Sequence, residues 1–342
     1  MQISQLGEFG LIQRIKIALP HPPAEVIVGI GDDVAVLKVS DSEYLLATCD
    51  VQVENVHFSR SVISPYQLGR RIAAINVSDI AAMAGAPLWA LVSLALPREL
   101  ETDFVDALYE GMHEQLNIAG AVIVGGNLSR IEKAIVIDLC LLGKVTPDKL
   151  LLRSGTCKGD LILVTGWLGD SRAGLELIRR PELIISENSR KQVVQRHLTP
   201  QPRLREGQEL GSSAMVHSLV DVSDGLLSDI GHICRASRVA AEIWLGSVPV
   251  SSAAREAAHA AGQDVSTWAL AGGEDYELLF TASPDVSAEI QGILEERTGT
   301  PCSVIGRVVD EAEGTHLFLE NGTKMALPEG SVGWDHFAST RP

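Results

Sequence analysis

The 342-residue sequence lacks any long uninterrupted apolar run, although hydrophobic residues make up 46% of it. None of its apolar runs reaches the ~18 residues that a membrane-spanning helix requires. Residues 1–16 are amphipathic and lack the basic start and apolar stretch of a secretory signal peptide, so we expect none. We therefore expect a cytoplasmic protein with no membrane partner, long enough for roughly two domains of ~150 residues each.

Basic residues are few. Lys and Arg together number 28, against 44 Asp and Glu, and the formal net charge is −16. A nucleic-acid partner is therefore not expected, because no basic stripe exists to displace the counterions of a phosphate backbone. A small phosphorylated substrate is compatible with this charge if bound cations reverse its sign locally.

Cysteine is also scarce and scattered. The five cysteines are Cys49, Cys140, Cys157, Cys234 and Cys302. No two of them have C-x-x-C spacing and their number is odd, which argues against a disulfide framework and against the usual zinc motifs. We predict reduced thiols, as in cytosolic proteins.

Several catalytic and nucleotide-binding signatures are absent. There is no Gly-x-x-x-x-Gly-Lys-Ser/Thr phosphate loop, no His-Arg-Asp and Asp-Phe-Gly set of a protein kinase, and no Gly-x-Ser-x-Gly elbow. Residues 113–117 begin like a metalloprotease helix, but the second histidine is missing. Gly29–Val34 begins like a dinucleotide-binding turn, but Val34 replaces the third glycine and no helix pattern follows, which argues against a Rossmann site.

The sequence does contain alternating strand and helix patterns. Apolar residues recur at helical spacing over 66–83, and Gly85 and Pro87 end this helix. Thr102 is placed to cap a helix that runs to about residue 118. Further patterns predict helices at 171–178 and 224–236, and strands at 44–49, 88–96, 121–124, 134–143, 161–165, 216–222, 277–281, 303–305 and 316–319. This order predicts an α/β (α+β) protein of two layered domains, residues 1–148 and 149–342.

Acidic residues lie where the apolar runs stop. Asp33 follows a glycine-containing turn, Asp50 ends a buried strand, and Asp221 and Asp224 end another. Carboxylates at strand ends often bind hard cations, and Mg²⁺ typically shares them with substrate phosphates. We therefore predict a site in which several Mg²⁺ ions hold the phosphates of a nucleotide.

Asp33 and a further acid, Asp79, each have an alternative structural explanation. The segment Gly31–Asp33 can be a polar turn between strands, where Asp is common. Asp79 lies inside the apolar helix pattern, where an unpaired charge costs several kcal/mol. Metal ligation would compensate this cost, and so would a salt bridge to Arg70 or Arg71.

Residues 221–225 give the sharpest local signal. Alternation along the strand turns Val222 toward the core and Asp221 and Ser223 to the other side. Asp224 can be the N-cap of the following helix, which explains Asp224 without a metal. An N-cap does not explain Asp221.

Four other features keep two interpretations open. Gly125–Asn127 and Gly272–Asp275 either let backbone approach a ligand closely or form turns. His57, between two apolar residues, is either a packed side chain or a functional group. Arg153 either contacts a phosphate or lies at the surface.

Taken in order, these segments resemble the thiamine-monophosphate kinase family. The matching stretches are Gly7–Ile12, Ile30–Asp33, Asp50 with Val56–Phe58, Asn76–Met83, Gly125–Asn127, Val164–Gly166, Leu168–Ser171, Arg196–Leu198, Asp221–Leu226, Gly272–Leu278 and Trp334–Phe337. The resemblance implies the fold shared with aminoimidazole ribonucleotide synthase, in which an N-terminal α/β domain dimerises through its sheet and a C-terminal α/β domain packs beside it. It also implies a homodimer, with ATP and substrate bound near the dimer interface.

The implied reaction is the Mg²⁺-assisted transfer of the ATP γ-phosphoryl group to thiamine monophosphate. The products are thiamine diphosphate and ADP, and the reaction is the final step of thiamine diphosphate biosynthesis. Phosphoryl transfer depends mainly on positioning and charge neutralisation, and the attacking phosphate oxygen is already anionic. We therefore expect no dedicated catalytic base, and the resemblance implies that no covalent phosphoenzyme forms.

The resemblance also implies site residues, position by position. The implied metal ligands are Asp33, Cys49 through its backbone carbonyl, Asp50, Asp79, Asn127, Asp221 and Asp224. The implied nucleotide contacts are Tyr109, Gly126, Asn127, Arg153 and Ser223. The implied substrate contacts are His57, Glu274 and Trp334. The aromatic ring of Trp334 suits the cationic thiazolium of thiamine.

Three positions depart from the family pattern. Asn127 stands where many members have Asp, and its carbonyl oxygen can still bind Mg²⁺, with one negative charge fewer. Cys49 replaces a common Thr, which leaves a backbone role intact. Asn55 replaces a common Gly, and Asn tolerates a positive φ better than other non-glycine residues, so we expect the turn to persist.

Two other classes of function compete with this one. A related ATP-using enzyme such as aminoimidazole ribonucleotide synthase, selenophosphate synthase or the hydrogenase-maturation dehydratase would use another acceptor. Selenophosphate synthase requires a reactive Cys near the N-terminus, and the dehydratase carries a C-terminal Cys; neither matches this sequence. The other class is a non-enzymatic Mg²⁺-nucleotide sensor, for which Asn127 and Cys49 are the best support.

Overall fold

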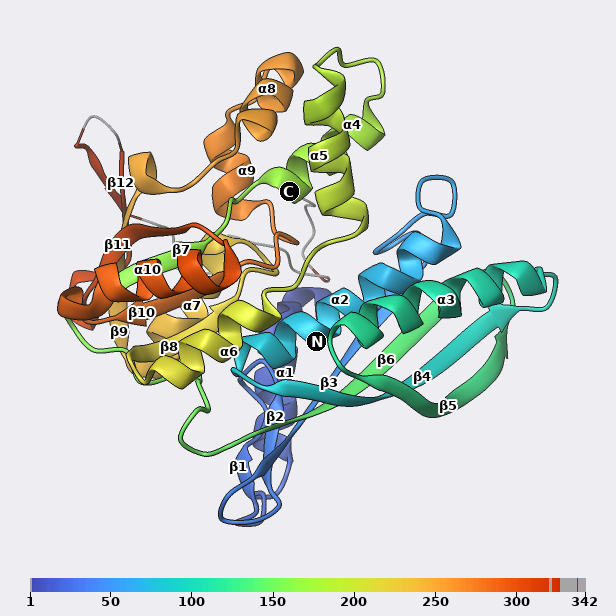
Figure 1. Cartoon of the computed structure of the whole chain (residues 1–342), viewed down its shortest axis with the longest axis horizontal. Helices are drawn as coiled ribbons and strands as arrows, with labels where there is room; N and C mark the ends of the chain where they lie inside the picture. Colours follow the sequence, from blue (N-terminus) through green and yellow to red (C-terminus); the bar gives the residue numbers. More distant parts are fainter. Residues whose placement is uncertain (1, 320–321, 327–336, 338–342) are drawn as a thin grey trace.

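A computed structural model describes residues 2–319, 322–326 and 337, in which helices pack on two β-sheets (Figure 1). The first sheet has the strand order β1-β2-β3-β6-β4-β5. Its strands are β1 (Val26–Val28), β2 (Ala35–Lys38), β3 (Tyr44–Val53), β4 (Ala86–Pro97), β5 (Val122–Ile131) and β6 (Val136–Val145). The pairing is antiparallel throughout except between β4 and β5, which run parallel.

Two helices, α2 (Pro65–Ala82) and α3 (Thr102–Ile118), cover one face of the first sheet. Alternate residues of β6 show which face is covered. Ile137, Leu139 and Leu141 are fully buried in the core beneath these helices, whereas the residues between them, such as Cys140, face the other way. A further helix, α1 (Gly7–Ala18), precedes the sheet.

The helix α2 starts with a capping box. The Ser64 side chain accepts a hydrogen bond from Gln67 N at 3.2 Å, and Pro65 occupies the first turn, where its missing N–H costs nothing. The expected helix at 66–83 is thus confirmed. The expected cap of α3 is wrong, because Glu101 is the N-cap and Thr102 is already helical.

The helices α2 and α3 cross at two glycines. A Cβ on Gly69 would lie 2.0 Å from the carbonyl oxygen of Leu108, and one on Gly111 would lie 2.0 Å from that of Tyr66. Contacts this short are impossible, so the close approach of the two backbones requires glycine at both positions. The crossing holds α2 in place between the first sheet and the rest of the molecule.

The second sheet has the strand order β13-β12-β9-β11-β7-β10-β8 and is antiparallel except where β12 meets β9. Its strands are β7 (Leu161–Thr165), β8 (Val216–Asp221), β9 (Val239–Trp244), β10 (Leu278–Ala282), β11 (Cys302–Asp310), β12 (His316–Phe318) and β13 (Lys324–Ala326). The helices of this region are α4 (Asp170–Arg179), α5 (Glu187–Leu198), α6 (Leu204–Ser213), α7 (Leu226–Ser237), α8 (Ser252–Ala261), α9 (Val265–Ala271) and α10 (Ser287–Thr298).

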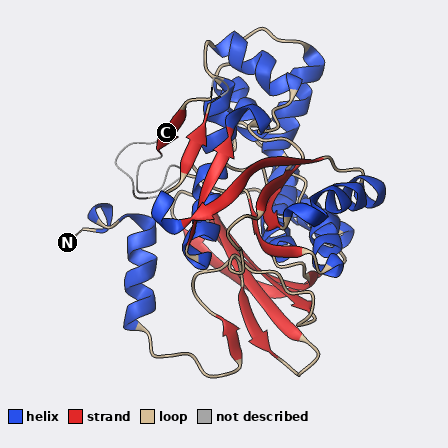
Figure 2. Cartoon of the chain, turned by 90° about the vertical axis from the view of Figure 1, so that its left-hand side faces the viewer, coloured by secondary structure: helices blue, strands red, loops and turns tan. Residues whose placement is uncertain are grey.

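Both faces of the second sheet are buried. On β7, Ile162 and Val164 pack in one apolar cluster with α7, whereas Leu163 packs in another with α6 and α10. All five residues of β10 are buried, so the sheet forms the middle layer between helices. In the view of Figure 2 most helices lie in the upper part and on the right of the molecule, and several strands run down to its lower edge.

Most of the expected elements are present, and the differences are local. The strand expected at 121–124 continues through Gly125–Asn127 and ends only at Ile131. The helix expected from 224 begins at Leu226. Of the helices formed by the described residues, none combines the length and the apolar character that crossing a membrane would require.

Candidate active site

Three carboxylates meet where β3, α2 and β8 come together. Asp50 lies on β3, Asp79 on α2 and Asp221 at the end of β8, and the charges of Asp50 and Asp221 both raise the pKa of Asp79. Thr48 Oγ1 donates to Asp79 Oδ2 at 2.5 Å, and Ser78 Oγ donates to Asp221 Oδ2 at 2.6 Å. These hydrogen bonds tie both sheets to α2 at one point.

The alternative interpretation, in which Asp79 forms a salt bridge with Arg70 or Arg71, is wrong. Arg70 donates to Glu114 Oε1 at 2.9 Å, on α3, and Arg71 pairs with Glu274, in the second region. Within the described part of the chain, neither arginine pairs with Asp79. The carboxylate of Asp79 therefore faces other carboxylates and receives a hydroxyl hydrogen bond, which does not neutralise its charge.

Arg153 lies inside this group of acids. Its Nη2 and Nε are 2.5 Å and 3.2 Å from Asp33 Oδ1, and its backbone N donates to Asp32 Oδ2 at 3.3 Å. The side chain is only 16% exposed, so the surface interpretation of Arg153 is wrong. The second oxygen of Asp33, Oδ2, is buried and has no hydrogen-bond partner among the described residues.

Burial and neighbouring negative charges raise the pKa of Asp50, Asp79 and Asp221. Burial raises the pKa of Asp50 to about 6, and Asp138 adds to the effect. Burial raises the pKa of Asp221 to about 7, and the charge of Asp33 adds to it. Asp79 is raised well above its usual pKa by burial and by its two neighbours.

A hard divalent cation fits this group, which we call the acidic cluster: Asp32, Asp33, Asp50, Asp79, Asp221 and Asp224. All the side-chain donors are oxygens, and a buried oxygen of Asp33 lacks a partner. The like charges that add to the raised pKa values of Asp79 and Asp221 would become favourable beside a cation. Oxygen ligands of this kind suit Mg²⁺.

The start of α7 extends the acidic cluster. Gly225, with φ of +115°, is the N-cap, so the prediction that Asp224 caps this helix is wrong. Asp229, which is 2% exposed, accepts a hydrogen bond from Gly225 N at 3.1 Å. The ligand atoms of Asp224, Asp229 and His232 all lie within 4.8 Å of one another. Sequence reasoning missed Asp229 and His232, although their spacing places both on one side of a helix that follows Asp224-Gly225.

The loop Gly272–Glu277 approaches the acidic cluster in a strained conformation. Gly273, Glu274 and Tyr276 have φ of +65°, +57° and +52°. For a non-glycine residue this left-handed conformation costs ~1–2 kcal/mol. Glu274 N donates to the carbonyl of Ser223 at 2.7 Å, which fixes the loop beside the end of β8.

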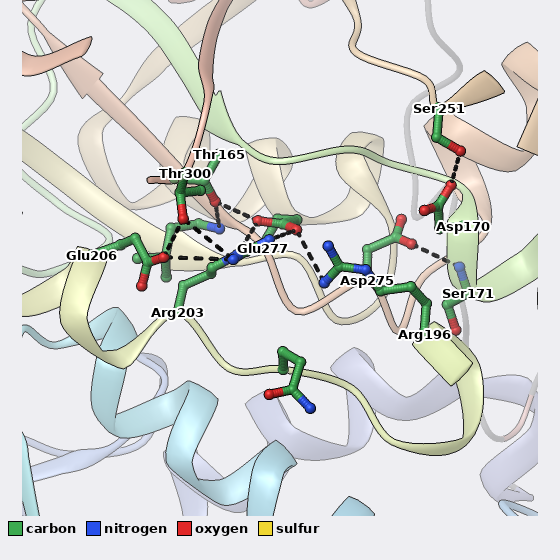
Figure 3. Close-up of polar contacts among 12 residues, drawn as sticks. Thr165, Asp170, Ser171, Arg196, Arg203, Glu206, Ser251, Asp275, Glu277 and Thr300 are labelled. Carbon is green, nitrogen blue, oxygen red and sulfur yellow. Dashed lines mark hydrogen bonds and ion pairs between the residues drawn. The ribbon is translucent and has the colours of Figure 1, made fainter. Parts of the chain in front are cut away.

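Two buried acids fasten this loop (Figure 3). Asp275 accepts hydrogen bonds from Gly169 N at 2.7 Å and Ser171 N at 3.1 Å, at the start of α4. Glu277 accepts two from Arg203, each of 2.6 Å. Burial raises the pKa of Asp275 to about 8. The contacts offset the strain of the loop and hold Glu274 in place.

Glu274 is surrounded by basic groups. Arg71 donates to its Oε1, and His197 Nδ1 lies 3.5 Å from its Oε2. Burial alone would raise the pKa of Glu274, but Arg71, His197 and His57 outweigh it and lower the pKa. His57 Nδ1 accepts a hydrogen bond from Val53 N at 3.0 Å, so its Nε2 is the nitrogen left to carry a proton in the neutral ring.

The remaining expected nucleotide contacts lie elsewhere in the chain. Tyr109 is on α3, and Gly126 and Asn127 are on β5, so the turn interpretation of Gly125–Asn127 is wrong. A Cβ on Gly126 would lie 1.8 Å from the carbonyl oxygen of Val92 on β4, which explains this glycine. Two strands separate β5 from β3, a spacing of ~14 Å between them. One chain therefore does not bring Asn127 beside Asp50.

Three further positions complete the comparison with the sequence. The side chain of Cys49 is exposed and alternates with Thr48, so it points away from Asp79. Only its backbone can reach the acidic cluster. Asn55 has φ of +66°, which confirms the expected turn. Trp334 lies outside the described residues.

The chain matches two family models of AIR synthase related proteins. The N-terminal domain model covers residues 31–145, and the C-terminal domain model covers residues 158–317. Both matches lie on the two sheets described above, the first on the sheet that carries Asp50 and the second on the sheet that carries Asp221.

The chain is also similar to named proteins over nearly its full length. It is 34% identical to the thiamine-monophosphate kinase of Escherichia coli O157:H7 over 97% of this chain and 99% of that protein. It is 37% identical to the enzyme of that name from Aquifex aeolicus, over 98% and 100%. The solved structure of AaThiL complexed with AMPPCP and TMP superposes with a TM-score of 0.82, at 36% identity over 98% of this chain and 99% of that one.

Proposed function

The chain belongs to the AIR synthase related family and, within it, to the thiamine-monophosphate kinases, and we propose that it transfers the γ-phosphoryl group of ATP to thiamine monophosphate. The products are thiamine diphosphate and ADP, and the reaction completes thiamine diphosphate biosynthesis. The observation that carries the proposal is the acidic cluster, in which carboxylates from three elements face one another and Asp33 keeps an unpartnered buried oxygen.

We propose Mg²⁺, in several ions, as the metal that this cluster holds. The residues that would bind it are Asp33, the carbonyl of Cys49, Asp50, Asp79, Asn127, Asp221 and Asp224. When bound, Mg²⁺ neutralises the phosphate charge that develops during transfer. Thr48 and Ser78 keep two of the carboxylates aimed at the site through the hydrogen bonds of 2.5 Å and 2.6 Å.

The side chains around the acidic cluster bind and orient the two substrates. Arg153 offers guanidinium donors that suit the phosphates of ATP. Tyr109, Gly126, Asn127 and Ser223 are the other proposed nucleotide contacts, and His57, Glu274 and Trp334 are the proposed contacts to thiamine monophosphate. The acceptor phosphate oxygen is anionic at neutral pH, so the chain needs no base to activate it, and transfer is direct.

We also propose that the protein is a homodimer formed through the uncovered face of the first sheet. Val51, Trp89, Leu91 and Val122 lie on this face and are 40–49% exposed. A contiguous apolar area on a sheet favours a partner surface. Pairing two copies there would also bring Asn127 of one subunit toward the acidic cluster of the other, which one chain alone does not achieve.

Two coarser features accompany the proposal. We place the domain boundary at 148/149, between the end of β6 and the start of β7. We place the protein in the cytoplasm, where its five free cysteines would stay reduced.

The experiment that tests the function is incubation of the purified protein with Mg²⁺, ATP and thiamine monophosphate, followed by chromatography for thiamine diphosphate. We expect product that disappears when EDTA removes the metal. Tight Mg²⁺-ATP binding without product would contradict the proposal and point to another acceptor or to a sensor. Asn127→Asp would then be the first variant to make, because it restores the acid that many family members carry.

A further inference from the structure

The helix α2 touches both the acidic cluster and the loop that carries Glu274. Ser78 donates to Asp221 Oδ2 at 2.6 Å, on the side of the acidic cluster. Arg71, two turns earlier on the same side of the helix, donates to Glu274 Oε1. The axial separation of these two contacts is ~10 Å, because α2 rises 1.5 Å per residue. A single rigid element therefore sets the spacing between the two parts of the site.

Arg71 is placed to act on Glu274 and not on a ligand. Its side chain is 2% exposed, whereas that of Glu274 is 34% exposed. Besides Glu274, the guanidinium donates to the carbonyl of His197 at the end of α5. Arg71 thus joins α2, α5 and the loop 272–277, and of the two paired side chains it is that of Glu274 that is partly exposed.

The backbone of Glu274 does not hold this geometry by itself. Its φ of +57° is unfavourable for a residue with a side chain, so the conformation depends on contacts from the surroundings. Arg71 also counters the effect of burial and lowers the pKa of Glu274. The carboxylate is kept ionised and in one orientation.

We propose that Arg71 is a positioning residue, which holds the Glu274 carboxylate in the orientation that binds the ring end of thiamine monophosphate. The helix α2 sets the distance between this carboxylate and the acidic cluster. Thiamine carries an amino group and a quaternary nitrogen, and both interact more strongly with a carboxylate than with a neutral carboxylic acid. The inference rests on the proposed function and adds to it how the protein recognises thiamine monophosphate, the substrate that accepts the phosphoryl group. ATP, which lacks a permanently cationic ring, does not depend on this contact.

The test compares Arg71→Met with Arg70→Met. Arg70 is the adjacent residue of the same helix, but it pairs with Glu114 on α3. We expect Arg71→Met to raise the KM for thiamine monophosphate ~10-fold or more, with kcat and the KM for ATP little changed, because a charge-assisted hydrogen bond to Glu274 is lost. Arg70→Met should change none of the three. Arg71→Lys keeps the charge and should recover part of the loss.

A double-mutant cycle separates positioning from general stabilisation. If Arg71 acts through Glu274, then Arg71→Met should have little further effect in a Glu274→Gln background. Additive effects, or equal losses for both substrates, would overturn the inference. Calorimetric binding of thiamine monophosphate gives the same comparison without turnover, and Arg71→Lys replaces Arg71→Met if the latter does not fold. A wild-type protein that forms no product would instead contradict the proposed function.

Discussion

The two sheets differ in how completely they are covered. The second sheet has helices on both faces, and every residue of β10 is buried. Among the described residues, helices cover only one face of the first sheet, and most residues of β5, at its edge, are exposed. The difference leaves the first sheet with an exposed face, which is the surface that we propose for pairing with a second copy. The acidic cluster lies where the two meet.

The largest effect should come from breaking the acidic cluster that joins the two regions. We expect Asp50→Ala to lower turnover by ~10³-fold or more, because phosphoryl transfer depends on fixed charges. Asp224→Ala should do the same, and Asp148→Ala, an exposed acid outside the cluster, should not. Turnover is measured by chromatography and folding by circular dichroism. Normal activity in either purified cluster variant would refute the metal assignment.

The next effect concerns the uncovered face of the first sheet. Leu91→Glu places a charge in the apolar area of this face, where burial against a partner would cost several kcal/mol. We expect a monomer by light scattering and a parallel loss of turnover. Ile184→Glu is the control, since Ile184 is 91% exposed in the second region. A Leu91→Glu protein that remains dimeric would show that the copies pair elsewhere.

A smaller effect should follow from disturbing the packing of α2 against α3, the helices that cover the other face of the first sheet. Gly69→Ala should lower the free energy of unfolding by ~1–3 kcal/mol, because the new Cβ would overlap the carbonyl of Leu108. Gly292→Ala, in α10 beside the second sheet, has open space and should raise it by ~0.5–1 kcal/mol. Denaturant titration of both variants measures the difference. Equal effects would mean that the α2–α3 crossing adjusts freely.

The smallest effect is a dependence of stability on pH in the metal-free protein. The folded state raises the pKa of Asp50 to about 6 and of Asp221 to about 7, above the ordinary value of 3.8. Folding is therefore favoured when these groups are protonated, and their contribution is lost as pH rises through these values. With EDTA, we expect a lower melting temperature at pH 7.5 than at pH 5.5. Mg²⁺ should remove most of the difference, and a difference that persists with Mg²⁺ would argue against its binding there.

Local patterns were enough to predict the elements that follow a regular period. The helix α2 shows helical spacing and is followed by Gly85 and Pro87, and β7 is a short apolar run before a glycine. Both were predicted to within one or two residues. The strand expected at 121–124 ended too early because Gly125-Gly126 looks like a turn, although Gly126 lies within the strand and is needed for the close approach of β4.

The acids of the site could be predicted, but not their partners. Asp50, Asp79 and Asp221 end apolar runs or interrupt a helix pattern, which local sequence shows. Arg71 and Glu274 are 203 residues apart, and no local pattern connects them. The sequence also could not show which of Arg70 and Arg71 contacts the second region. This depends on the side of α2 that faces that region, which the packing of both sheets decides.

The order of strands along the chain bears on how the molecule is made. Every strand of the first sheet lies within residues 26–145, so this sheet can form on the ribosome while the second half is still being synthesised. Its uncovered face is then available to a neighbouring nascent chain before Asp221 and the Glu274 loop exist. If two copies pair through this face, as we propose, chains translated from one messenger are close enough together for pairing to begin before the site is complete.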